Sequence, residues 1–66
     1  MTVTVNGHPR TIVEDASIAA LLAELGLAES RVAVEVNASV IRKSNWPATA
    51  LKENDRVEVV NFVGGG

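Results

Sequence analysis

The chain lacks cysteine and tyrosine, and it has only one phenylalanine, one tryptophan and one histidine. Without cysteine there are no disulfide bonds, thiolate metal sites or cysteine nucleophile, and a cytoplasmic location is the default expectation. No apolar run reaches the length of a signal peptide or a membrane span. The formal net charge is -2 and lysine and arginine do not cluster, so neither nucleic acid nor a membrane is expected as the main partner.

The length and the aliphatic content predict a small, strand-rich domain. The 66 residues are enough for one domain, and a core of this size rarely supplies more than roughly 3 to 5 kcal/mol of net stability. With so few aromatic residues, the interior must be built from eleven valines, five leucines and three isoleucines. A valine-rich interior favours β-strands.

Alternating apolar and polar residues predict five strands, of which the fourth is very short. They cover residues 1–5, 8–13, 31–36, 40–41 and 56–63. Asn6-Gly7 predicts a tight hairpin between the first two, because a type I′ turn needs positive φ at both central residues. Pro9 has no backbone N–H, which places its strand at an edge or a turn. In the last strand, Val57 and Val59 are expected to face inward.

One helix is predicted between the second and third strands. Ser17 is a good N-cap, apolar residues recur at helical spacing over Ile18–Leu25, and Gly26 fits the left-handed residue that ends a helix. Irregular chain is expected around Trp46, which should close one end of the core. This order of elements predicts an α+β protein of the ubiquitin-like β-grasp type, with a mixed four- to five-stranded sheet and one main helix packed on one face.

Three consecutive glycines follow the last strand, and their purpose is the main functional question. We expect a domain over residues 1–63 and a flexible C-terminal glycine tail over 64–66, which reaches about 10 Å when extended. Val60 and Phe62 fall out of phase with the inward-facing valines and should be exposed beside this tail. Together with Val63 they form a candidate partner-binding surface.

Side chains offer little catalytic chemistry. His8 lies beside a turn without a carboxylate to orient it, the serines fit no nucleophile-elbow pattern, and no spacing is typical of a metal site. We therefore do not expect an enzyme with its own active site. The remaining reactive group is the α-carboxylate of Gly66, which is ionised at neutral pH and can form a mixed anhydride with AMP by attack on ATP. A sulfur nucleophile can then displace AMP, and Gly64 and Gly65 give slender access to such a site.

The whole chain resembles the ubiquitin-like sulfur carriers, and most closely the ThiS family of thiamin thiazole synthesis. The features that carry the resemblance are the Asn6-Gly7 hairpin, Ser17-Ile18 at the start of a helix with Leu25-Gly26-Leu27 at its end, and the stretches 34–37, 42–46 and 55–66. Asn54 departs from the family, which often has glycine before the aspartate.

The resemblance implies a set of partners and no bound cofactor. An E1-like adenylyltransferase (ThiF-like) would activate Gly66 with ATP, and a sulfur donor such as a cysteine desulfurase would lead to a thiocarboxylate, which is a C-terminal 1-thioglycine. Thiazole synthase (ThiG-like) would accept the sulfur. Three alternatives remain open: the small subunit of molybdopterin synthase, whose members are usually longer and richer in aromatic residues, a ubiquitin-like protein modifier, and a non-covalent binding domain with an incidental tail.

Overall fold

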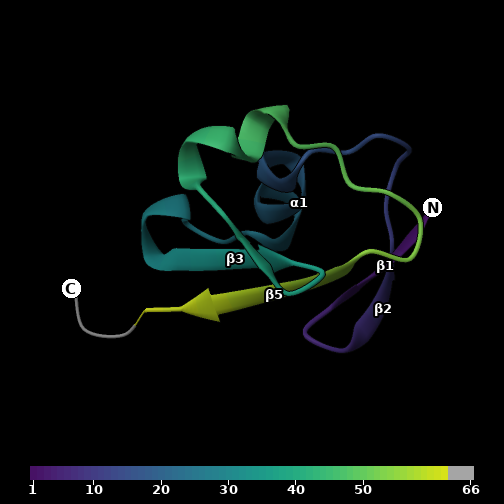
Figure 1. The fold of residues 1–66 in the computed structure, drawn as a ribbon, viewed down its shortest axis with the longest axis horizontal. Helices are drawn as coiled ribbons and strands as arrows, with labels where there is room; N and C mark the ends of the chain where they lie inside the picture. The colour runs from purple at the N-terminus through teal and green to yellow at the C-terminus, as the bar shows by residue number, and fades with distance from the viewer. Residues whose placement is uncertain (63–66) are drawn as a thin grey trace.

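A five-stranded mixed sheet forms one layer of the structure, and the α-helix α1 covers one of its faces (Figure 1). The computed structural model describes residues 1–62. In chain order its elements are β1 (Thr2–Val5), β2 (His8–Thr11), α1 (Ile18–Leu25), the 3-10 helix η1 (Glu29–Arg31), β3 (Val32–Val36), β4 (Ser39–Ile41), the 3-10 helix η2 (Lys43–Ala48) and β5 (Arg56–Asn61). The predicted α+β architecture of the β-grasp type is confirmed.

The sheet order is β2-β1-β5-β3-β4, which places the last strand in the centre. β5 runs parallel to β1 and antiparallel to β3, while β1 with β2 and β3 with β4 form antiparallel hairpins. The expected position of the last strand beside the first is therefore confirmed. β2, which contains Pro9, lies at an edge of the sheet as the missing N–H requires.

Both hairpins close with two residues in the left-handed region. In the first, Asn6 has φ 50° and Gly7 has φ 83°, which confirms the turn predicted from this dipeptide. In the second, Asn37 has φ 51° and Ala38 has φ 71° between the paired residues Val36 and Ser39. An alanine in this region is strained, because its Cβ approaches the backbone in a way that glycine avoids.

The helix begins and ends where the sequence predicts. The Ser17 hydroxyl accepts a hydrogen bond from the Ala20 N–H at 3.0 Å, and Gly26 adopts φ 72°. The N–H groups of Gly26 and Leu27 then donate to the carbonyls of Ala23 and Leu22 at 3.1 and 3.0 Å. This pair of bonds is a Schellman motif, and it satisfies carbonyl groups that the last helical turn leaves free.

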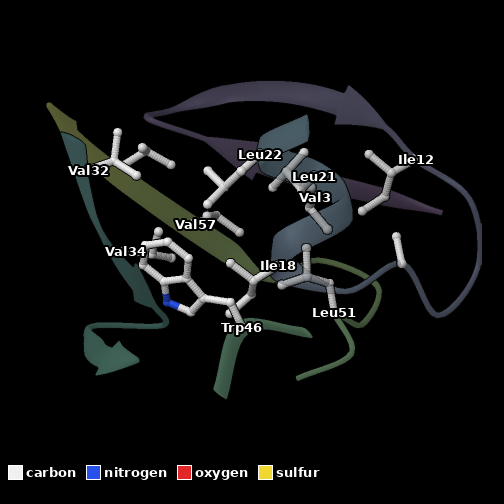
Figure 2. Packing of buried hydrophobic residues seen from close by; sticks show 12 residues of the cluster. Val3, Ile12, Ile18, Leu21, Leu22, Val32, Val34, Trp46, Leu51 and Val57 are labelled. Carbon is white, nitrogen blue, oxygen red and sulfur yellow. The ribbon is translucent and has the colours of Figure 1, made fainter. Parts of the chain in front are cut away.

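The core lies between α1 and the sheet (Figure 2). Figure 2 shows Ile18, Leu21 and Leu22 of the helix directed toward the valines of β1, β3 and β5. The Trp46 indole is 2% exposed, lies beside Val34 and donates from Nε1 to the Ile41 carbonyl at 2.9 Å. The prediction that Trp46 closes one end of the core is confirmed.

Some predicted boundaries are wrong. The second strand ends at Thr11 instead of residue 13, although Ile12 still exchanges two backbone hydrogen bonds with Met1, both at 2.8 Å, and Val13 beyond it is 73% exposed. The segment around Trp46 is the 3-10 helix η2 and not irregular chain, and Pro47 lies within it. The last strand ends at Asn61, one residue before Phe62, and Val63 lies outside the described residues.

Candidate functional site

β5 presents two faces of opposite character. Val57 and Val59 point into the core, where they are 0% and 9% exposed. Val60 and Phe62 are each 54% exposed, which is consistent with the alternation of a strand and confirms the predicted orientation. Val60 and Phe62 occupy consecutive outward positions of the chain, and both side chains are apolar and half exposed. Such a pair forms a surface suited to contact with another protein.

We call Val60 and Phe62 the docking patch. The cross-strand partner of Val60 is Ala33, whose small side chain leaves the valine uncovered, and the Phe62 N–H donates to the Arg31 carbonyl at 2.7 Å. The patch therefore lies on the sheet face opposite α1 and is held by backbone bonds to β3. Val63, the third residue predicted for this surface, lies outside the described residues.

Two asparagines hold β5 through their side chains. The Asn6 amide accepts from the Val59 N–H at 2.7 Å and donates to the Val59 carbonyl at 3.1 Å. Asn37 accepts from the Arg56 N–H at 2.9 Å and donates to the Asp55 carboxylate at 3.0 Å. Each asparagine is the first residue of a hairpin turn, so the turns fix both sides of the strand that leads to the patch. No local pattern in the sequence indicates these long-range bonds.

A hollow lies between β3 and β5 on the outer face of the sheet. It is lined by Glu35, Ala38, Arg56 and Glu58. Glu35 and Glu58 are directly opposite each other in the β3–β5 register, and neither forms an ion pair within the part of the chain that the structure describes. Like charges in such a position repel each other modestly across the two strands.

Other parts of the described chain add no competing site. His8 is exposed at the hairpin, as expected for a solvated turn residue. Over residues 1–62, no group of three acidic, histidine or cysteine side chains could hold a metal ion. The one α-helix of this part is too short to cross a membrane. The predicted reactive residue Gly66 and its neighbours Gly64 and Gly65 lie outside the described residues, so their roles stay predictions.

The fold and the patch on its last strand define a ubiquitin-like β-grasp domain, and comparison with known proteins gives the family. The model of the ThiS family matches residues 3–66. A crystal structure of the thiamine biosynthesis protein ThiS from Geobacter metallireducens is 39% identical, with a TM-score of 0.85 and full coverage of both chains. The chain belongs to the ThiS family, which confirms the resemblance stated from the sequence.

Two longer proteins also contain a segment similar to the whole chain. Thiazole synthases from Paramagnetospirillum magneticum and Magnetococcus marinus are 38% and 39% identical over 66 residues, which is 100% of this chain. The chain spans only 20% of the length of each of these relatives. The similarity therefore concerns one part of each thiazole synthase.

Proposed function

We propose that this protein is a sulfur carrier of thiamin synthesis and that the α-carboxylate of Gly66 is the group that carries sulfur. The family match carries this proposal, because it extends from the first strand through residue 66. The geometry adds a reason for the position of the carrier group. The exposed Val60 and Phe62 lie at the end of β5, four and two residues before Gly64 in the sequence, so a protein that binds the patch is close to the glycines along the chain.

The chemistry proceeds by acyl activation on the partner enzyme. An oxygen of the Gly66 carboxylate attacks the α-phosphorus of ATP, and pyrophosphate leaves to give an acyl adenylate. A sulfur nucleophile at the oxidation level of hydrosulfide then forms the C–S bond while AMP departs. The resulting thiocarboxylate is the C-terminal 1-thioglycine, and Gly64 and Gly65 allow it to enter a channel too narrow for side chains.

The partners follow from this sequence of steps. An E1-like adenylyltransferase (ThiF-like) consumes the ATP, so the carrier itself needs no bound cofactor. A donor such as a cysteine desulfurase supplies the sulfur as a persulfide, and a thiol reductant brings it to the hydrosulfide level in which it displaces AMP. A ThiG-like thiazole synthase accepts it. The occurrence of a segment like this chain within two thiazole synthases supports that partner. The cytoplasmic location is retained as a prediction of the sequence.

Intact-mass spectrometry of the protein purified from its native host tests the carrier chemistry. We expect a fraction of the chains to carry the mass of one sulfur in place of one oxygen, localised by fragmentation to Gly66.

A second test adds one alanine after Gly66, which displaces the reactive carboxylate and should abolish ATP–pyrophosphate exchange with the adenylyltransferase. Exchange that continues in the extended chain would refute the role of Gly66. Loss of molybdenum-enzyme activity with intact thiazole supply on gene deletion would favour the molybdopterin alternative.

The docking patch is tested by introducing a charge. Phe62→Asp should raise the KM for adenylation at least tenfold, while the melting temperature changes little because the side chain is 54% exposed. Val13→Asp is the matched control, since Val13 is 73% exposed in the loop after β2 and is not part of the patch. A large loss of melting temperature in Phe62→Asp would show that Phe62 supports the fold, and equal effects of the two variants on KM would refute a specific patch.

A further inference from the structure

Asn6 is followed by glycine, and no other asparagine of the chain is. The backbone nitrogen of the next residue can attack an asparagine side chain, and glycine obstructs this attack least because it has no Cβ. The Gly7 nitrogen then forms a bond to Asn6 Cγ, and the side-chain nitrogen leaves as ammonia, taking up the proton that Gly7 loses. Water opens the resulting five-membered imide to give aspartate or isoaspartate. Both residues are exposed at the hairpin, so water reaches the pair.

The folded turn holds the reacting atoms apart. Asn6 has φ 50°, in the left-handed region, where Cβ lies close to the oxygen of the residue's own carbonyl group. The Gly7 nitrogen is on the opposite side of that carbonyl carbon, so it points away from the Asn6 side chain. Ring closure requires the reverse arrangement, with the nitrogen next to Cβ. The attack therefore requires the turn to leave its observed conformation.

The Asn6 amide is also fixed at its far end. Its oxygen accepts from the Val59 N–H at 2.7 Å, and its nitrogen donates to the Val59 carbonyl at 3.1 Å. The Asn6 backbone N–H donates in addition to the Val57 carbonyl at 2.8 Å. Rotation of the side chain toward the Gly7 nitrogen breaks both amide bonds, so the reaction requires the hairpin to open from β5.

We propose that Asn6 is a site of spontaneous deamidation in this protein, and that the turn and the bonds to Val59 slow the reaction while the hairpin is in place. The inference does not depend on the proposed function. Because ammonia is lost, each opening of the hairpin exposes Asn6 to a permanent change. The aspartate product lacks the donor to the Val59 carbonyl, and isoaspartate adds a carbon atom to the main chain of a two-residue turn. Both products weaken the attachment of β5, the strand that leads to the docking patch.

Peptide mapping by mass spectrometry measures the conversion of Asn6 at mildly alkaline pH. We expect the folded protein to deamidate there at least tenfold more slowly than the same chain unfolded in guanidinium chloride. Equal rates in the two states would overturn the proposal, because the fold would then give no protection. Absence of reaction in the unfolded chain would overturn it as well, since Asn6 would not be a deamidation site.

Ala38→Gly supplies a matched control in the second hairpin. Asn37 has φ 51° and its amide is held by Arg56 and Asp55, so the substitution places a second asparagine–glycine pair in the same kind of turn. In the folded variant both asparagines should be protected at least tenfold, and in the unfolded variant both should react at similar rates. Rapid deamidation of Asn37 in the folded variant would show that a held asparagine in this turn is not protected, and would overturn the mechanism.

The consequence for the fold is measured on the product itself. Ion exchange separates the deamidated chains, which carry one more negative charge, from the unmodified protein. The deamidated chains should melt at a lower temperature, and those with isoaspartate should lose more than those with aspartate because their turn is longer. A melting temperature equal to that of the unmodified protein would overturn the claim that deamidation weakens the attachment of β5.

Discussion

Replacement of Asn6 by alanine should lower the free energy of unfolding by about 3 kcal/mol. The side chain makes two partly buried hydrogen bonds to the Val59 backbone, at 2.7 and 3.1 Å, and each contributes about 1 kcal/mol net. Alanine at the observed φ of 50° adds a strain of about 1 kcal/mol, because its Cβ is disfavoured in the left-handed region. In a domain of this size each kcal/mol corresponds to roughly 4 to 8 °C, so the melting temperature should fall by roughly 12 to 24 °C.

Asn54 offers a control that isolates the backbone strain. It has φ 70°, and its side chain makes no hydrogen bond within the described part of the chain. Asn54→Ala should therefore lose only the conformational contribution of about 1 kcal/mol. Asn6→Asp should lie between the two alanine variants, because it tolerates the left-handed region and keeps an acceptor for Val59 but removes the donor.

Urea denaturation followed by the fluorescence of Trp46 provides the assay, since this single tryptophan is 2% exposed in the folded state. The comparison requires equal m-values among the variants, which shows that the surface exposed on unfolding is unchanged. If Asn6→Ala and Asn54→Ala destabilise the domain equally, the two bonds to Val59 contribute nothing to stability. The structural account of how the hairpin holds β5 would then be refuted.

Two further substitutions test features of the outer face. Ala38→Gly should raise the free energy of unfolding by about 0.5 to 1 kcal/mol, because glycine relieves the strain of φ 71°; a destabilised variant in urea titration would contradict this. Glu58→Gln should raise it by about 0.5 kcal/mol, since it removes the repulsion with Glu35 directly opposite. The gain should shrink at about 1 M salt, where charges are screened, and a salt-independent gain would show that repulsion is not its cause.

Local signals in the sequence predicted most of the secondary structure. Ser17 and Gly26 mark the ends of the helix because caps act on backbone groups within a few residues. The Asn6-Gly7 turn is similarly local, and the two faces of β5 follow from the period of a strand. These features depend on residues close together in the chain, so sequence alone contains the information for them.

The connections between distant segments could not be predicted in the same way. The bond from Asn6 to Val59 spans 53 residues and exists only because β1 and β5 pair in one particular register. The proposed protection of Asn6 depends on the same register, which is a property of the assembled sheet.

The energetics of docking favour a partner that does more than cover the patch. Ordering the three predicted tail glycines costs about 3 to 6 kcal/mol of backbone entropy. Complete burial of Val60 and Phe62, which are already half buried, returns only about 1 to 1.5 kcal/mol each. The patch alone therefore leaves a deficit. Hydrogen bonds from the partner to the backbone of the glycines, each contributing about 1 kcal/mol, would reduce this deficit without requiring any side chain on the glycines. Hydrogen bonds fix both sides of β5 as far as Val59. The loss of backbone entropy on binding therefore falls on the residues that enter the partner.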